Sequence, residues 1–391
     1  MHFLSADFIF DGYTFLPSNT ILVIEDNGTI KDILHNQQIE ASQHYQGMIM
    51  PGMINTHCHL ELSHLKGAIE KHSGLVDFLL QINKHRAKNT PEEIIHAINK
   101  AEKEMYNNGL VAVGDICNTF YTLAQKQKQN LLYHSFVECF GLLDSNANER
   151  FESAVNLYNE FASMHPSSIV LHAPYSVSDK LIALVNETSY KKITTIHNQE
   201  SEEENILFQS GTGNFLKLFE AILGKAHFFT PTNKTSLQRY LPKLSNQQKI
   251  ILVHNTFTDE MDIQFAHSLN KELYWCLCPN ANLYIENALP DIPLLLKNNC
   301  CITLGTDSLA SNDNLNILGE ILTIQKHFPA ISLKEKLGWA TINGAKALGI
   351  EQRFGSIAIG KKPGLVNVKG ITNEEYIPNE MNDLGINVLR F

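Results

Sequence analysis

PGMINTHCH, residues 51–59, is the stretch that decides the fold of this chain. It is a short apolar run that ends in two histidines, His57 and His59, placed two positions apart. Alternate residues of a β-strand point to the same side, so both imidazoles are expected to project into one space. Histidine pairs with this spacing also occur on surfaces and in cores, so their meaning depends on the rest of the chain.

Short apolar runs recur after this stretch, and segments with helical periodicity separate them. One such segment, 91–109, opens with Pro91, places Ile94, Ile98 and Met105 on one face, and stops at Gly109. Strands that alternate with helices indicate a parallel sheet. Counting 51–59, the runs make eight strands, the number that closes a (β/α)₈ TIM-type barrel, here expected over 51–350. The further strands are expected at 111–115, 133–139, 169–172, 193–197, 250–254, 273–278 and 301–307.

Both ends of the chain have strand character instead. We expect segments 1–50 and 351–391 to form one small β-sandwich that flanks the barrel. Asn27-Gly28 predicts a two-residue hairpin turn, because both residues tolerate positive φ. The expected terminal strands lie at 8–10, 21–24, 30–33, 355–360 and 365–368.

The composition is that of a globular protein with a sizeable core. The chain has 391 residues, 43% of them hydrophobic and 18% charged, with a formal charge of 31 − 41 = −10. An acidic balance argues against a nucleic-acid partner, because phosphate contacts need clustered Lys and Arg. Seven cysteines without a regular framework are typical of reduced thiols. No apolar run reaches the ~20 residues of a membrane span, and no secretion signal is recognised, so we expect a soluble cytoplasmic protein.

Polar residues that suit a metal stand at the ends of the predicted strands. In a barrel these ends lie at one face, where such enzymes keep their active sites. Neutral imidazole and carboxylate suit zinc or ferrous iron. The polar segment 201–216 directly follows one strand end and is a candidate lid. The strand-end residues are His57, His59, His172, His197, His254 and Asp307.

Several motifs resemble those of the amidohydrolase superfamily. PGMINTHCH resembles its first-strand signature, LGTDSLASN at 304–312 its eighth-strand signature, and the terminal strands its split β-sandwich. HNQE at 197–200 is similar to the His-x-x-Glu of the cytosine/guanine/adenosine-type deaminase branch. CPNANLY at 278–284 resembles that branch's strand-seven loop, although Asn280-Ala281 replaces the more usual Arg-Ser. HLELS at 59–63 is closest to aminodeoxyfutalosine deaminases and their adenosine- or S-adenosylhomocysteine-deaminating relatives.

The resemblance implies that His57, His59, His197 and Asp307 bind one divalent metal, with zinc expected and iron as the alternative. Members with two metals carry a bridging Lys or Glu at the end of strand four, where this chain has His172. It also implies that metal-bound hydroxide attacks the substrate.

The remaining roles are also implied by the resemblance. Glu200 is expected to shuttle the proton, His254 to stabilise developing charge, and Asp307 to accept a proton as well. His172 is expected to contact the substrate, and Ser311 is expected to fix either Asp307 or the substrate.

These roles predict the deamination of a cyclic amidine in a purine nucleoside-like small molecule, such as aminodeoxyfutalosine or an adenosine derivative. The alternatives are hydrolysis of a cyclic or linear amide and a non-catalytic, metal-stabilised binding protein. Glu61 is either a substrate contact or a carboxylate at a helix N-terminus, and Glu138 either faces the pocket or is structural. We expect no nucleic-acid or membrane partner, and a possible homodimer follows from the family alone.

Overall fold

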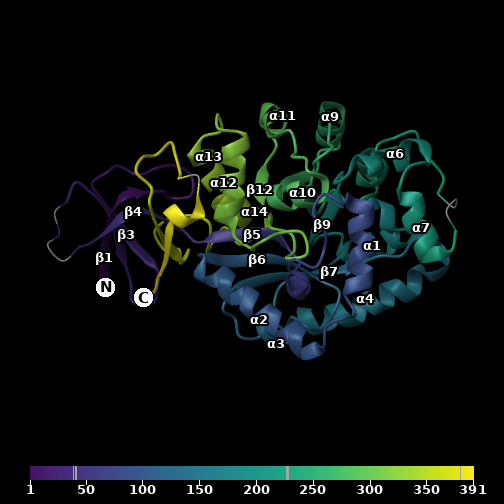
Figure 1. The fold of residues 1–391 in the computed structure, drawn as a ribbon. Coiled ribbons are helices and arrows are strands. Elements are labelled where there is room, and N and C mark those ends of the chain that lie inside the picture. Colours follow the sequence, from purple (N-terminus) through teal and green to yellow (C-terminus); the bar gives the residue numbers. More distant parts are fainter. Residues whose placement is uncertain (38, 40–41, 226–228, 379) are drawn as a thin grey trace.

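The computed structural model has a mixed α/β fold with two four-stranded parallel sheets, and it describes residues 1–37, 39, 42–225, 229–378 and 380–391 (Figure 1). One sheet has the order β5-β6-β7-β8 and the other β12-β11-β10-β9. All eight strands predicted for the central region are present. Their bounds are β5 Met53–Cys58, β6 Leu110–Cys117, β7 Leu132–Cys139, β8 Ser167–Leu171, β9 Ile193–Asn198, β10 Lys249–His254, β11 Glu272–Leu277 and β12 Ile302–Leu304.

The two parallel sheets adjoin at both of their outer edges. At one seam the Thr306 amide donates to the His57 carbonyl over 3.0 Å, and Cys58 forms a parallel bridge with Asp307. At the other seam the His197 amide donates to the His172 carbonyl, also over 3.0 Å. The carboxyl ends of β5, β9 and β12 therefore come together.

Helices follow most of the strands. The predicted helix at 91–109 is α2, which begins after Thr90 in a capping box with Glu93 and ends before Gly109, whose φ is +82°. The helices are α1 Leu75–His85, α2 Pro91–Asn107, α3 Leu123–Lys126, α4 Ala147–Ala162, α5 Asp179–Ser189, α6 Glu202–Ser210, α7 Phe215–Leu223, α8 Ser236–Tyr240, α9 Glu260–Ser268, α10 Pro279–Glu286, α11 Ile292–Lys297, α12 Ile317–His327, α13 Leu333–Gly338 and α14 Gly344–Ala347. None of the helices among these described residues is long and apolar enough to cross a membrane.

The two ends of the chain meet in a six-stranded sheet with the order β14-β13-β4-β1-β2-β3, as the purple and yellow segments of Figure 1 illustrate. β4 continues almost directly into β5, so this sheet is tied to the strand that carries His57. Strands from both ends of the chain share this one sheet, whereas the two-layer sandwich stays a prediction. The bounds are β1 His2–Ile9, β2 Thr20–Ile24, β3 Ile30–His35, β4 Gln43–Pro51, β13 Leu365–Lys369 and β14 Gly385–Leu389.

Two local predictions for the terminal segments are wrong. Residues 355–360 form no strand, because their backbone amides bond to separate places: Ile357 donates to the Asp11 carbonyl and Gly360 to the Ile30 carbonyl. The hairpin between β2 and β3 has the three-residue loop 26–28, closed by the Glu25 amide on the Thr29 carbonyl over 2.9 Å. Only Gly28 in that loop adopts positive φ, at +87°.

Candidate active site

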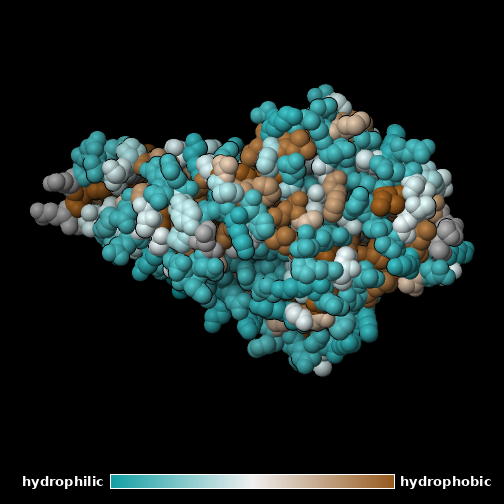
Figure 2. All heavy atoms as spheres, turned by 45° about the horizontal axis from the view of Figure 1, so that its top comes forward, coloured by the Kyte–Doolittle hydropathy of each residue, from teal (hydrophilic) through white to brown (hydrophobic). Residues whose placement is uncertain are grey.

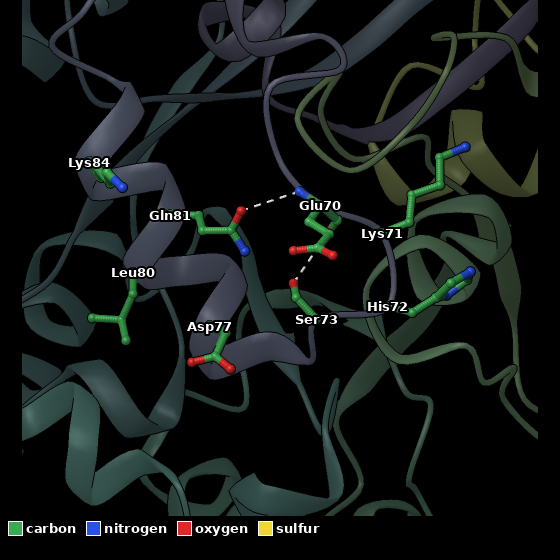
Figure 3. A pocket seen from close by; sticks show the side chains of 8 residues that line it. All are labelled: Glu70, Lys71, His72, Ser73, Asp77, Leu80, Gln81 and Lys84. Carbon is green, nitrogen blue, oxygen red and sulfur yellow. Dashed lines mark hydrogen bonds between the residues drawn. The ribbon is translucent and has the colours of Figure 1, made fainter.

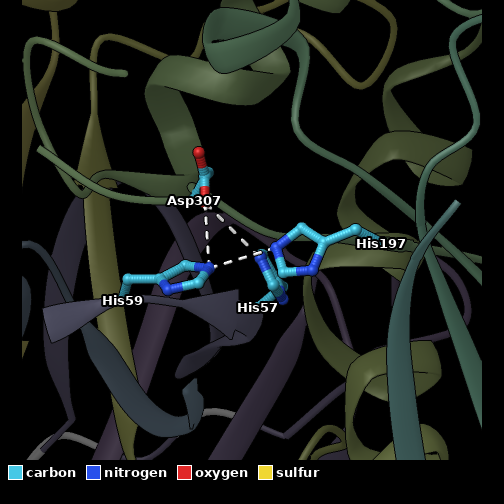
Figure 4. A group of neighbouring side chains, drawn as sticks. All are labelled: His57, His59, His197 and Asp307. Carbon is cyan, nitrogen blue, oxygen red and sulfur yellow. Dashed lines mark hydrogen bonds and ion pairs between the residues drawn. The ribbon is translucent and has the colours of Figure 1, made fainter. Parts of the chain in front are cut away.

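Four potential metal ligands meet where β5, β9 and β12 end (Figure 4). His57 lies in β5, His59 follows it, His197 lies in β9, and Asp307 follows β12. Asp307 Oδ1 is 3.4 Å from Nε2 of both His57 and His59, and the Nε2 atoms of His59 and His197 are 3.2 Å apart. One ligand atom from each residue lies within 4.8 Å of the others. The predicted cluster is therefore assembled in the structure.

The donor atoms of this cluster fit a divalent cation. Both ring nitrogens of His57 are buried and have no hydrogen-bond partner among the described residues. His197 Nδ1 donates to the His172 carbonyl over 2.7 Å, which fixes the tautomer and leaves the Nε2 lone pair for a ligand. Buried polar atoms are normally paired, so an unpaired imidazole beside a carboxylate indicates a missing partner that accepts lone pairs.

Burial sets the ionisation states that a metal requires. It lowers the pKa of His59 well below the usual range and that of His197 to about 4, so both rings are neutral at pH 7. Burial alone would raise the pKa of Asp307, but the neighbouring imidazoles of His57, His59 and His254 hold it well below its usual value. His59 and His197 therefore offer neutral nitrogen atoms, and Asp307 offers a charged carboxylate.

Glu200 and His254 lie beside the ligands. Glu200 Oε1 is 3.5 Å from His254 Nε2, and both side chains are buried. Burial raises the pKa of Glu200 well above its usual value, with Asp307 adding to the effect. His254 and Asp307 have φ values of +75° and +55°, a costly backbone region for residues other than glycine. Strain of this kind is concentrated at functional sites.

Ser311 contacts Asp307 and His172 lines the cavity, while a contact of either residue with a substrate stays a prediction. Ser311 Oγ donates to Asp307 Oδ2, which orients the carboxylate. His172 lines the cavity next to the ligands, and its Nδ1 is 2.7 Å from Ser176 Oγ. Burial lowers the pKa of His172 to about 4, so this ring is neutral as well.

Glu61 is largely engaged by the chain itself. Its Oε2 accepts from the amides of Asn118 and Thr119 and from Thr119 Oγ1, at 2.9 to 3.0 Å. Its Oε1 accepts from Arg86 Nη2 over 2.7 Å. Glu61 lines the cavity, but these bonds leave little acceptor capacity for a ligand, so a direct substrate contact stays a prediction.

Glu138 faces the cavity. Its Oε2 accepts from Asn118 Nδ2 over 2.9 Å, and its Oε1 has no hydrogen-bond partner among the described residues. Glu138, His172 and His197 lie close enough to form a second potential ligand group. In this group Glu138 Oε1 is 3.8 Å from His197 Nδ1. That nitrogen already donates to the His172 carbonyl, so the first group is the better metal site.

The candidate lid is helical. Ser201 caps α6, which ends at Gly211 with φ +70°, and α7 begins at Phe215. Leu218, Phe219 and Ile222 of α7 line the cavity, just beyond the predicted segment 201–216. A closing motion of this segment stays a prediction.

Sequence reasoning gave no role to Asn282, Asn118 or Arg86. Asn282 lies on α10, and its Nδ2 donates to His254 Nδ1 over 3.1 Å. The residue belongs to the motif at 278–284, but the motif alone assigns it no role. Asn118 follows the end of β6, and the strand-end rule misses it because the predicted strand stops at 115. Nothing in the sequence marks Arg86, which comes directly after α1.

The cavity above the cluster is lined by the candidate metal ligands and proton carriers. It is lined by His59, His172, His197, Glu200, His254 and Asp307 together with α1 and α7 side chains. Another hollow, between the start of α1 and the segment before it, shares none of these residues (Figure 3). It is lined by Glu70, Lys71, His72, Ser73, Asp77, Leu80, Gln81 and Lys84, and its bonds, such as Gln81 Oε1 with the Glu70 amide, are local.

Comparisons with known proteins place the chain among relatives that are deaminases. The model of the amidohydrolase family matches residues 48–385. An aminodeoxyfutalosine deaminase from Nitratiruptor sp. is 26% identical over 380 residues, covering 90% of this chain and 87% of that protein. The homologues include adenosine-type deaminases of the same family.

Solved structures show the same fold. The Helicobacter pylori aminofutalosine deaminase in complex with methylthio-coformycin has a TM-score of 0.83 at 20% identity and covers 98% of this chain and 95% of that one. An adenosine deaminase from Xanthomonas campestris with bound zinc has a TM-score of 0.73 at 21% identity, with 94% and 84% covered. By the match to its family model, this chain belongs to the amidohydrolase family.

Proposed function

We propose that this protein is a metal-dependent deaminase that hydrolyses the C–N bond of a cyclic amidine in an adenosine-type nucleoside. The observation that carries the proposal is the position of Glu200, a buried carboxylate 3.5 Å from His254 Nε2 and next to the ligand cluster. Holding a metal requires neither group. Ring-nitrogen protonation does require a proton carrier, and the deaminases among the relatives support this chemistry.

The proposed metal is one divalent ion, zinc first, held by His57, His59, His197 and Asp307. Three nitrogen donors and one carboxylate suit zinc and also ferrous iron, and the zinc in the Xanthomonas relative favours the former. When bound, such an ion lowers the pKa of coordinated water towards about 7 and so supplies a nucleophile at neutral pH. Metal analysis should find about one ion per chain.

The chain's own residues would handle the protons. Glu200, whose pKa is raised by burial, would take a proton from the attacking water and pass it to a ring nitrogen of the substrate. His254 would hydrogen-bond the attacking oxygen through Nε2, since its Nδ1 accepts from Asn282. Asp307, oriented by Ser311, would take the second proton of the attacking water and deliver it to the amino group, which leaves as ammonia, and His172 would contact the substrate.

The architecture that supports this site is inferred to be one (β/α)₈ barrel spanning 51–350. The backbone contacts between β5 and the segment after β12, and between the ends of β8 and β9, support closure of the two sheets into a ring. Segments 1–50 and 351–391 would then form the flanking β-sandwich. The homodimer and the cytoplasmic location stay predictions.

Ammonia release tests the function. Purified protein is assayed with adenosine derivatives, guanine, cytosine and triazines, and ammonia is expected from an adenosine derivative. Glu200→Gln should lower kcat by roughly 10²–10⁴-fold without changing the metal content. Glu202→Gln, an exposed neighbour, is the matched control and should behave as the unaltered protein. Release of a carboxylate without ammonia would indicate an amidase instead, and no turnover together with metal binding would indicate a binding protein.

A further inference from the structure

A buried network of hydrogen bonds joins the ends of β9 and β10, the strands that lead to Glu200 and His254. At the end of β9, Asn198 Nδ2 donates to Asn255 Oδ1 over 3.0 Å. In the opposite direction, the Asn255 amide donates to the Asn198 carbonyl, also over 3.0 Å. Asn255 directly follows His254, so these bonds tie the neighbour of His254 to the segment that presents Glu200.

Gln199, which directly precedes the candidate proton carrier, has every polar group of its backbone and side chain bonded. Its amide donates to Glu204 Oε1 over 3.3 Å, and its carbonyl accepts from the Phe257 amide over 2.9 Å. Its Oε1 accepts from Thr258 Oγ1 over 2.7 Å, and its Nε2 donates to Asp262 Oδ2 over 2.6 Å. Gln199 is therefore held by α6, by α9 and by the segment after β10.

The backbone at both strand ends is strained. Gln199, His254 and Asn255 have φ values of +46°, +75° and +59°. Such a conformation is costly for residues other than glycine and persists only where the surroundings impose it. The network supplies this constraint, and it acts on the backbone that decides where Glu200 and His254 point.

Asp262 anchors the network from outside the cavity. Its side chain is buried under α9, whereas its neighbour Met261 is 72% exposed. Oδ2 accepts from Gln199, and Oδ1 accepts from Thr235 Oγ1 and Gln238 Nε2 at 2.5 and 2.9 Å. β9, α6 and α9 lie in the half of the molecule away from the terminal sheet (Figure 1), where the surface mixes hydrophilic and hydrophobic residues (Figure 2). Asp262 is not among the described residues that line the cavity, so its influence on a reaction there must pass through the residues it holds.

We propose that Asp262 and Gln199 are positioning residues that hold Glu200 in register with His254 for proton transfer. The inference rests on the proposed function, in which Glu200 carries the proton and His254 bonds the attacking oxygen. Glu200 Oε1 and His254 Nε2 are 3.5 Å apart and follow different strands. A misplacement of reacting groups by about 1 Å can lower a rate roughly 100-fold, so this distance needs a rigid support.

Asp262→Asn tests the proposal, because it breaks one link of the network and keeps the size of the side chain. The single oxygen of the asparagine can accept from Thr235 and Gln238 together, which leaves its NH₂ group against Gln199 Nε2, also a donor. In the ammonia assay kcat should fall about tenfold, the range found when a partner that orients a site residue is lost. KM and the metal content should change little.

Glu102→Gln is the matched control for this variant. Glu102 is also a buried carboxylate that accepts from three side chains, those of Gln125, Asn130 and Tyr133, and it does not line the cavity. Both variants should lose stability in urea denaturation, but the control should keep its kcat. An unaltered kcat in folded Asp262→Asn would overturn the proposal.

A cycle of single and double variants with Glu200→Gln separates positioning from a general effect on the fold. If Asp262 acts through Glu200, Asp262→Asn lowers kcat about tenfold in the unaltered protein but changes the residual kcat of Glu200→Gln little. The residual turnover is measured at high enzyme concentration. The same loss in both backgrounds would show that Asp262 does not act through Glu200.

Thr258→Val is a milder test that remains informative if Asp262→Asn does not fold. It removes the hydroxyl that donates to Gln199 Oε1 and keeps the size of the side chain. Thr256→Val is its matched control, because the buried Thr256 Oγ1 has no hydrogen-bond partner among the described residues. kcat should fall in Thr258→Val at unchanged KM and stay constant in Thr256→Val. Equal kcat in the two variants would contradict the role of Gln199.

The two proposals fail in different ways in these experiments. If no adenosine derivative releases ammonia, the proposed function itself is wrong. If a derivative is deaminated but Asp262→Asn and Thr258→Val keep their kcat, or if the loss in Asp262→Asn is independent of Glu200, only the positioning role is wrong.

Discussion

Two of the buried clusters of ionisable side chains among the described residues differ in how completely their polar atoms are paired. In the first, which we call the lysine cluster, Lys126 is fully buried and its Nζ bonds Asp115, Ser135 and Cys117 at 2.6, 2.8 and 3.0 Å. The other Asp115 oxygen accepts from the Leu60 amide. The second is the ligand cluster around Asp307.

In the ligand cluster, buried atoms lack such partners. Both ring nitrogens of His57 and Nε2 of His254 have no hydrogen bond among the described residues, and the backbone at His254 and Asp307 is strained. Both clusters contain a buried carboxylate and nitrogen groups, so burial and charge alone do not separate them. The completely paired lysine cluster is therefore assigned a structural role, whereas unpaired atoms together with a strained backbone point to ligand binding in the ligand cluster.

The largest expected effect comes from removing the anion of the ligand cluster. Asp307→Ala should lose most of its bound metal, and deaminase activity should fall by roughly a thousandfold or more. Metal analysis and the ammonia assay measure the two losses. Asp313→Ala, an exposed aspartate six positions on, is the control and should keep both. Full metal content and activity in Asp307→Ala would remove the distinction between the clusters.

Breaking the lysine cluster should affect stability instead of chemistry. Lys126→Met leaves Asp115 as an uncompensated buried charge, so the free energy of unfolding should fall by about 3–5 kcal/mol. The double variant Asp115→Asn with Lys126→Met should recover part of this loss, because the asparagine keeps an acceptor for the Leu60 amide. Urea denaturation measures both. The folded variants should keep their metal and their kcat; loss of either at unchanged stability would contradict a structural role.

The ligand cluster could be predicted from the sequence because parallel strands bring their carboxyl ends to one place. His57, His197 and Asp307 are distant in sequence, yet each stands at the end of an apolar run, and the rule of strand ends places them together. Ser311 and Glu200 follow those ends at short offsets, and their roles are implied by the resemblance to the amidohydrolase family.

The lysine cluster could not be predicted in this way. Lys126 lies in a short helix and Asp115 in β6, and only the packing of α3 under β6 and β7 brings the two together. Asn282 projects from α10 and Arg86 follows α1, so neither is at a strand end. The strand predicted at 355–360 is absent for a similar reason. Alternation of apolar and polar residues predicts an extended chain, but among the described residues no neighbouring strand pairs with this segment.

Glu204 is a buried carboxylate that belongs to neither cluster, and its titration makes the stability of the protein depend on pH. It lies on α6, accepts from the Gln199 amide next to Glu200, and burial raises its pKa from 4.5 to about 7. Below about pH 4.5 both folded and unfolded states carry the proton. As the pH rises from about 4.5 to about 7 the unfolded state loses the proton while the folded state keeps it, so stability falls by about 3 kcal/mol in total and then stays constant at higher pH.

Glu204→Gln removes this titration. The free energy of unfolding of the unaltered protein relative to Glu204→Gln should therefore drop between pH 5 and pH 8, as measured by urea denaturation at the two pH values. A difference between the two proteins that is independent of pH, or that grows with pH, would show that Glu204 is ionised in the folded state throughout this range.

The smallest expected effect concerns Asn282, whose side-chain nitrogen is hydrogen-bonded to His254 beside the ligand cluster. Its Nδ2 donates to His254 Nδ1, so a neutral His254 carries its proton on Nε2, the atom that faces Glu200. Without that bond both tautomers become accessible and the ring is free to rotate. Asn282→Ala should therefore lower kcat about tenfold, the range found when a partner that orients a site residue is lost.

KM and the metal content should change little in Asn282→Ala, because the ligands do not contact this side chain. Asn156→Ala, an exposed asparagine on α4, controls for the loss of a carboxamide elsewhere. A merely structural role would lower stability and leave kcat of the folded protein intact, which thermal unfolding and active-site titration distinguish. A fall in kcat at unchanged stability would show that this hydrogen bond affects catalysis and not only folding. The reason is that the bond to Nδ1 of His254 determines that Nε2 carries the proton and faces Glu200.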